Sequence, residues 1–207
     1  AVGLYSGEVM VCDISGAWKL KVGAGGHAAG EVLAIDLAGG ILVSGSGQPV
    51  YYSDQTCPGA TLRIVRLEDT SRVTHEIGKD GGGHRNSIRG VKIVEYAEDA
   101  DKPTTCTAVT SSDDGQVIVW DLLKGKVVRK MGDAVADDTP PWATNIVVVD
   151  KTTILTASSA KCVVQYDWQA GTALRTVART GHPASWSPTS LSFHPATRSL
   201  AVGFLDG

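Results

Sequence analysis

The stretch SSDDGQVIVWDL, residues 111–122, decides the fold class of this chain. Its run VIVW (117–120) is β-branched and aromatic, which is typical of a β-strand. The DDG that precedes it (113–115) suits a tight turn from an earlier strand. A hairpin alone does not require a large indole at the end of its second strand. We therefore expect Trp120 to have a specific partner elsewhere in its sheet.

Versions of this strand recur along the chain, as GEVMVCDI (7–14), ATLRIVRL (60–67) and KCVVQYDW (161–168). A strand of small residues precedes each one, and a further copy of it, LAVGFLDG, spans 200–207. A third apolar strand comes before that, and an outer strand fills each remaining gap. No segment shows a 3.6-residue period over a helical length. Short strands separated by Gly, Pro and Asp therefore predict an all-β fold of four-stranded antiparallel units.

The spacing between these units is about 41 to 54 residues, which is typical of β-propeller blades. We expect a single domain over 1–207 with about four blades. The complete blades are expected at about 17–67, 73–121 and 126–167, and partial blades at 1–14 and 173–207. Both ends of the chain fall at the same point of the repeat, so we expect this propeller to be part of a larger one.

Composition excludes several classes of function. The chain has 207 residues and a net charge of −3, which gives no electrostatic reason to expect nucleic acid or an anionic membrane as a partner. No apolar run approaches the roughly 18 residues of a membrane span, and the first residues show no signal-peptide pattern. The four cysteines form no CxxC pair, which argues against a zinc site and fits a reducing compartment. We expect an intracellular protein, cytoplasmic or nuclear, with no cofactor and no bound metal.

GGGH (81–84) followed by SSDDGQVIVWDL (111–122) resembles a blade of the WD-repeat family. The resemblance covers nearly the whole chain and is most specific over 73–122. It implies a β-propeller, usually of seven blades. It also implies a hydrogen-bonded tetrad, in which an indole bonds a hydroxyl, the hydroxyl bonds a histidine and the histidine bonds a turn aspartate. By position the tetrad residues are Trp120, Ser112, His84 and Asp114.

The other units depart from this pattern. The unit at 17–67 keeps His27 and Ser46 but has Val65 where the Trp belongs. The unit at 126–167 has Tyr166 at the Trp position and lacks a Gly-His pair. We therefore expect one complete tetrad, with stability coming mainly from the packing of apolar strands.

No catalytic motif stands out, because the chain has no HExxH, no GxSxG elbow and no Walker loop. The residues predict a protein that is not an enzyme, and the resemblance implies a WD-repeat scaffold that presents protein-binding surfaces in a multiprotein assembly. One alternative is a substrate receptor of a ubiquitin ligase, but that role requires Arg or Lys where this chain has Leu123. Another is an RNA-associated subunit of a ribosome-assembly complex, which the charge balance does not favour.

Long loops at one face of the expected propeller indicate where other proteins bind. They carry residue types that are enriched in interface hot spots. The alternative is that the two tyrosines extend a strand and the two tryptophans pack beneath their own loops. The candidate partner-binding residues are Tyr51, Tyr52, Arg85, Trp142 and Trp186.

Overall fold

The computed structural model describes residues 1–12, 15, 18–22, 27, 30–47, 60–67, 73–78, 81–99, 102–132, 143–158, 162–178 and 188–204. These residues form β-strands and contain no α-helix. The strands are β1 (Val2–Gly3), β2 (Val9–Cys12), β3 (Trp18–Val22), β4 (Val32–Ala38), β5 (Ile41–Ser46), β6 (Leu62–Arg66), β7 (Val73–Ile77), β8 (Ile88–Asp99), β9 (Lys102–Ser112), β10 (Gln116–Asp121), β11 (Lys126–Gly132), β12 (Ala143–Val148), β13 (Thr153–Ser158), β14 (Cys162–Asp167), β15 (Thr172–Ala178), β16 (Pro188–His194) and β17 (Ser199–Phe204).

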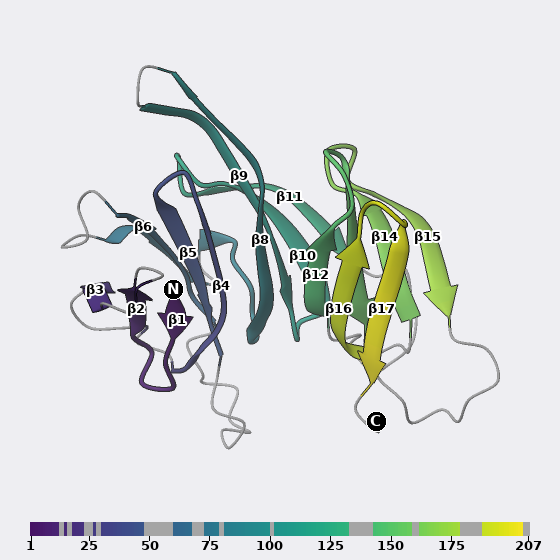
Figure 1. Cartoon of the computed structure of the whole chain (residues 1–207), viewed down its shortest axis with the longest axis horizontal. Coiled ribbons are helices and arrows are strands. Elements are labelled where there is room, and N and C mark those ends of the chain that lie inside the picture. Colours follow the sequence, from purple (N-terminus) through teal and green to yellow (C-terminus); the bar gives the residue numbers. More distant parts are fainter. Residues whose placement is uncertain are drawn as a thin grey trace.

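The strands form five antiparallel sheets that follow one another along the chain. The described residues give sheets β1–β2–β3, β4–β5–β6–β7, β8–β9–β10–β11, β12–β13–β14–β15 and β16–β17, which we call the first to the fifth sheet. Each strand pairs with its neighbour in sequence, as short connections between antiparallel strands favour. The prediction of an all-β chain with four-stranded antiparallel sheets is therefore confirmed. Figure 1 shows the sheets succeeding one another from the purple N-terminal end to the yellow C-terminal end.

The predicted blade bounds are wrong by one strand. The outer strands were expected to open the units at 17–67, 73–121 and 126–167. Instead, β3 pairs with β2, β7 with β6 and β11 with β10, so each outer strand closes the sheet before it. The physical reason is local, because a short turn joins each outer strand to the strand preceding it, whereas a longer segment separates it from the strand that follows. The sequence repeat is thus out of phase with the sheets.

Apolar clusters fill the spaces between successive sheets. In β10, Val117 and Val119 face the cluster shared with the fourth sheet, while Ile118 and Trp120 face the cluster shared with the second. Both faces of the strand are apolar because the sheet is covered on both sides. Burial of an indole of about 200 Å² is worth about 5 kcal/mol at the usual 25 cal/mol per Å². Trp120 is fully buried and is therefore a principal contributor to this packing.

The innermost strands of the last four sheets lie next to each other. β4 contacts β8, β8 contacts β12, and β12 contacts β16. The Asp36 carboxylate of β4 accepts a hydrogen bond from the backbone N–H of Ile93 in β8, at 2.8 Å. This side chain satisfies an edge group that no strand pairs, and so it links two inner strands.

The hairpin of β8 and β9 is longer than the other inner hairpins and projects beyond the sheets (Figure 1). Tyr96, in the projecting part, lies against the turn of the second sheet, where a side chain on Gly39 would overlap its ring. The projection is therefore braced by the neighbouring sheet.

Candidate functional site

A chain of buried hydrogen bonds crosses the third sheet. Trp120 donates its Nε1–H to Thr110 Oγ1 at 2.7 Å, and His84 Nε2 lies 2.7 Å from the same oxygen. His84 Nδ1 lies 3.1 Å from both carboxylate oxygens of Asp114. Because a carboxylate only accepts, Nδ1 carries the hydrogen, and in the neutral ring the Thr110 hydroxyl donates to Nε2. The chain ties the segment before β8 to the turn between β9 and β10.

The carboxylate end of this chain is held ionised. Burial opposes ionisation of Asp114, but hydrogen bonds from His84 and from the backbone amides of Arg85 and Gln116 outweigh it. Together these contacts hold the pKa of Asp114 below its usual value. The turn therefore keeps its negative charge and its bonds to both neighbouring segments at neutral pH.

The assignment of the tetrad hydroxyl to Ser112 is wrong. Ser112 Oγ instead donates to the Asn86 carbonyl at 2.9 Å and accepts from the backbone N–H of Asp114 at 3.1 Å. The strand register gives the reason. Trp120 lies opposite Ala108, so Thr110 is its diagonal neighbour on the same face, whereas Ser112 is two residues farther along. An indole reaches one diagonal step of about 7 Å but not two.

The second sheet contains a related series of buried hydrogen bonds, made by different residues. His27 Nε2 lies 2.8 Å from Ser44 Oγ, and Nδ1 lies 2.7 Å from Thr61 Oγ1. Thr61 thus takes the place of the turn aspartate. Ser46 was expected to bond the histidine and does not; it accepts from the backbone N–H of Thr61 at 2.8 Å instead. Burial, with a smaller contribution from the Arg63 charge, lowers the pKa of His27 to about 4.

The hydroxyls that sequence reasoning missed are therefore Thr110, Ser44 and Thr61. The signal for the first two was present in the sequence. Counting the antiparallel register back from the turn places each of them diagonally from the position occupied by Trp120 or Val65. Thr61 carried no comparable signal, because its role depends on the path of the segment that contains His27.

Arg85 is the candidate partner-binding residue that the structure describes. Its side chain is exposed, while its backbone N–H donates to Asp114 Oδ2 at 2.7 Å. Nearby, Arg89 binds Asp113 Oδ2 through Nε at 2.8 Å and Nη2 at 2.7 Å. The backbone of Arg85 is thus held by a hydrogen bond to the β9–β10 turn, and the Arg89–Asp113 ion pair joins β8 to the same turn. Tyr51, Tyr52, Trp142 and Trp186 lie outside the described residues, so their grouping with Arg85 stays a prediction.

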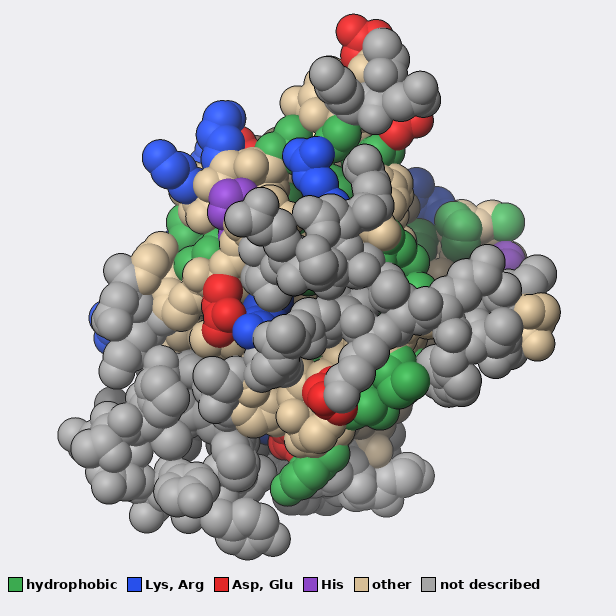
Figure 2. All heavy atoms as spheres, turned by 90° about the vertical axis from the view of Figure 1, so that its left-hand side faces the viewer, with side chains coloured by type: hydrophobic (Ala, Val, Ile, Leu, Met, Phe, Trp, Pro, Cys, Tyr) green, Lys and Arg blue, Asp and Glu red, His purple; other side chains and the backbone are tan. Residues whose placement is uncertain are grey.

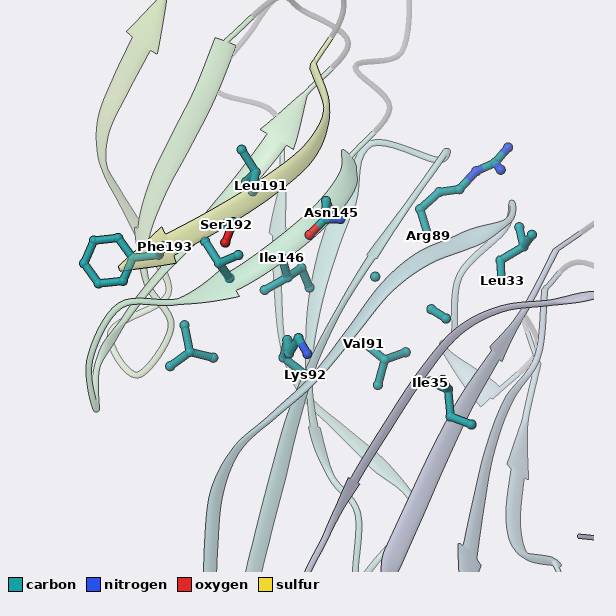
Figure 3. A pocket seen from close by; sticks show the side chains of 14 residues that line it. Leu33, Ile35, Arg89, Val91, Lys92, Asn145, Ile146, Leu191, Ser192 and Phe193 are labelled. Atoms are coloured by element: carbon teal, nitrogen blue, oxygen red, sulfur yellow. The ribbon is translucent and has the colours of Figure 1, made fainter. Parts of the chain in front are cut away.

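A concavity of about 670 Å³ lies among the innermost strands. All of its lining residues belong to β4, β8, β12 or β16. Figure 3 shows apolar side chains such as Ile35, Val91 and Phe193 around it, with Arg89 extending away at one end. Lys92 also lines it and lies 3.7 Å from Asp36. Both cations have carboxylate partners, so the concavity combines apolar surface with largely neutralised charge.

Among the described residues, no three His, Cys, Asp or Glu side chains are placed to hold a metal ion. Burial and the Asp121 charge raise the pKa of the Cys106 thiol to about 11, which keeps it protonated and poorly nucleophilic. In the described part of the chain, no helix is long and apolar enough to cross a membrane.

Fold and site together define an all-β protein of successive antiparallel sheets with a hollow between their inner strands. No family model matches the chain, and no curated protein matches its sequence. Among solved structures, the chain is similar to a computationally designed protein called Ika8, with a TM-score of 0.64 and 18% identity over 98% of this chain. It covers 54% of that protein and so spans about half its length. At this identity the likeness shows the fold alone.

Proposed function

We propose that this chain is part of a WD-repeat β-propeller and acts as a non-catalytic scaffold that binds other proteins through its loop face. Three observations support this proposal. They are the four-strand period, the convergence of the inner strands, and the series of hydrogen bonds that links Trp120 to Asp114. The family usually has seven blades, so the propeller would be larger than the sheets described. Its partners are then other subunits of a protein assembly.

The observation that carries the proposal is that Arg85 combines an exposed side chain with a fixed backbone. Its backbone N–H donates to Asp114, and Asp114 is in turn bonded to His84. Because the backbone at Arg85 is already ordered, binding through this residue costs little further backbone freedom, and arginine is enriched in interface hot spots. Among its described residues, the face at the N-terminal end of the sheet series carries both acidic and basic side chains (Figure 2). Charges of both signs suit protein contacts better than a polyanion.

The ubiquitin-ligase alternative gains no support from Leu123. Its side chain packs against the core between the second and third sheets, and its carbonyl is bonded by His75. A packing role accounts for this position without a docking role.

Affinity capture with quantitative mass spectrometry tests the proposal. Arg85→Ala should reduce recovery of the proteins that the wild-type chain retains by about 5- to 30-fold, as expected for a loss of 1–2 kcal/mol. Lys130→Ala, an exposed cation on β11, is the matched control and should change nothing. The melting temperature of Arg85→Ala should stay at the wild-type value.

The predicted loop aromatics extend this test. A variant that combines Tyr51→Ala with Trp186→Ala should weaken the same interactions. Undiminished recovery with both this variant and Arg85→Ala would move the interface away from the loop face.

A further inference from the structure

In each four-stranded sheet, the residue after the third strand donates an equivalent backbone hydrogen bond to the start of the second strand or the turn before it. The donor and acceptor pairs are Leu67 and Gly40, Leu122 and Cys106, and Trp168 and Thr152, at 2.8 to 2.9 Å. In the second and fourth sheets the acceptor comes directly before β5 or β13. In the third sheet the acceptor lies inside β9, and four strand residues, 102–105, come before it. The hairpin of β8 and β9 is therefore extended past the end of β10.

This extension leaves one edge of β9 open. β8 pairs with the extension on one side, but no described strand pairs with 102–105 on the other. The Cys106 carbonyl points to that other side, where it meets Leu122. Backbone groups of alternate residues point the same way, so the N–H and C=O of Thr104 also face the open side, whereas the nitrogen of Pro103 does not. None of the described residues bonds these two groups of Thr104.

Additional sheets in the series would not close this edge. The third sheet has all four of its strands, and complete four-stranded sheets precede and follow it. Only a longer β10 could pair here, but the chain turns toward β11 after Asp121. The Asp121 carboxylate fixes that turn by accepting the backbone N–H of Lys124 at 3.0 Å. A strand beside 102–105 must therefore come from outside the described strands.

A hollow of about 320 Å³ lies at the open edge. Residues 104–107 line it on one side, and the β10–β11 turn and β11 contribute Leu123 and Val128 on the other. Val128 is 58% exposed. Because side chains alternate between the two faces of a strand, a strand added beside Thr104 would direct every second side chain toward this hollow. Apolar side chains there would remove Val128 from water.

The other strand of the hairpin supplies negative charge. Glu95, Glu98 and Asp99 of β8 are exposed, and none of them forms an ion pair among the described residues. Glu95 accepts a hydrogen bond from the hydroxyl of Thr107 at 3.3 Å, and Glu98 accepts one from Tyr96 at 2.6 Å. Neighbouring strands are only about 4.8 Å apart, so a long cationic side chain on an added strand can meet these carboxylates across β9. The edge therefore favours a basic strand.

We propose that the open edge at 102–105 is a docking site for an extended basic segment of another protein, which adds to β9 as a further strand. Strand addition at an exposed edge is a common mode of peptide recognition. The main chain of the segment bonds Thr104, its lysines or arginines reach the β8 carboxylates, and its apolar side chains enter the hollow. Tyr96 already braces the hairpin against the second sheet, which limits the ordering that binding requires. The site lies at the opposite end of β8 from Arg85, so this proposal and the loop-face proposal can fail independently.

Binding of designed peptides tests the site. The probe is a fluorescent octapeptide of alternating valine and lysine, and its anisotropy with the 207-residue chain should show saturable binding. The same peptide with glutamate in place of lysine should bind at least about tenfold more weakly, because like charges then face each other. The valine–lysine peptide with N-methylated central amides should also bind at least about tenfold more weakly, because strand addition depends on main-chain hydrogen bonds.

Two variants of one residue isolate the backbone edge. Thr104→Pro removes the N–H that faces the peptide and should weaken binding by about tenfold or more. Thr104→Ala is the matched control, since it keeps the N–H, and it should bind like the wild type. Arg85→Ala should also bind like the wild type. Thermal melts establish that each variant remains folded, and the N-methylated peptide tests the same hydrogen bonds on the unaltered protein.

Four results would overturn the proposal. The first is no saturable binding, in which case the charges and Pro103 serve only to keep the edge from pairing. The second is equal binding of the lysine and glutamate peptides. The third is full binding of the N-methylated peptide, or equal binding by Thr104→Pro and Thr104→Ala. The fourth is self-association that Thr104→Pro abolishes, since a second copy of the chain would then occupy the edge.

Discussion

At Thr110, one hydroxyl serves two buried ring nitrogens. Trp120 Nε1 and His84 Nε2 each lie 2.7 Å from its oxygen, and all three side chains are buried. Buried polar groups without a partner lose their hydration without replacement, so the members of such a chain depend on each other. The indole that ends the VIVW strand is therefore both a packing residue and a donor.

Replacing Thr110 should show that Trp120 and His84 depend on its hydroxyl for their hydrogen bonds. Thr110→Val keeps the shape but leaves the two nitrogens unpaired, which should lower the free energy of unfolding by about 1–3 kcal/mol for each. Trp120→Phe should cost about 1–3 kcal/mol in the wild type and less in Thr110→Val, because its partner is already gone. Urea unfolding measures both. Additive costs would show that the two side chains are not coupled, and Thr104→Val on the exposed part of β9 is the control.

His27 should make stability depend on pH. Burial and Arg63 lower its pKa to about 4 in the folded protein, against 6.5 as the usual value. The unfolded chain then binds more protons between these two values, so stability falls as pH drops from about 6.5 to 4. The loss from this residue is at most about 3 kcal/mol. Chemical denaturation at pH 7, 5.5 and 4.5 should show it, with a shallower slope in His27→Gln; identical slopes would contradict the assignment.

At the scale of elements, each sheet approaches the next closely through small residues on its inner strands. A Cβ on Gly45 of β5 would lie 2.5 Å from Ile88 Cγ2 at the start of β8. Gly90 of β8 is similarly restricted by Ser111 and Ile146. These glycines sit in strands because another sheet takes the space of their side chains.

Gly45→Ala should therefore lower the free energy of unfolding by about 1–3 kcal/mol through overpacking. Ile88→Ala alone should cost about 2–5 kcal/mol by leaving a cavity, and the double variant should cost less than the sum. Gly132→Ala is the control, since a Cβ there would meet only Gln116, at 3.8 Å. A Gly45→Ala protein as stable as this control would mean that the sheets are packed less closely there.

At the scale of the molecule, the sheets form a series in which each contacts its neighbours. The third sheet is covered on both faces, and β9 and β10 are buried over most of their length. β17 has exposed or half-buried residues throughout and an edge that no described strand pairs. In such a series, local stability follows coverage by neighbours.

Amide hydrogen exchange followed by mass spectrometry should reflect this gradient. Protection should be greatest in β9 and β10, intermediate in β13 and β14, and least in β16 and β17. Protection in β17 equal to that in β9 would contradict this gradient.

Much of the architecture was predictable from the sequence. The run at 117–120 and its copies identified strands, and the spacing of the copies identified four-stranded units. These signals are local, because side-chain alternation and turn chemistry are determined by residues close in sequence. The His84–Asp114 pairing was also expected, but from the family resemblance rather than from spacing alone.

The sequence by itself therefore determined which segments are strands and how many form a unit. Only the tertiary structure decided that β7 belongs to the sheet before it, that Thr110 rather than Ser112 bonds Trp120, and that Thr104 lies on an edge that no described strand pairs. The physical reason is the same in each case. Which strand edge pairs, which diagonal neighbour an indole reaches and which face another sheet covers depend on register and packing between residues far apart in the chain.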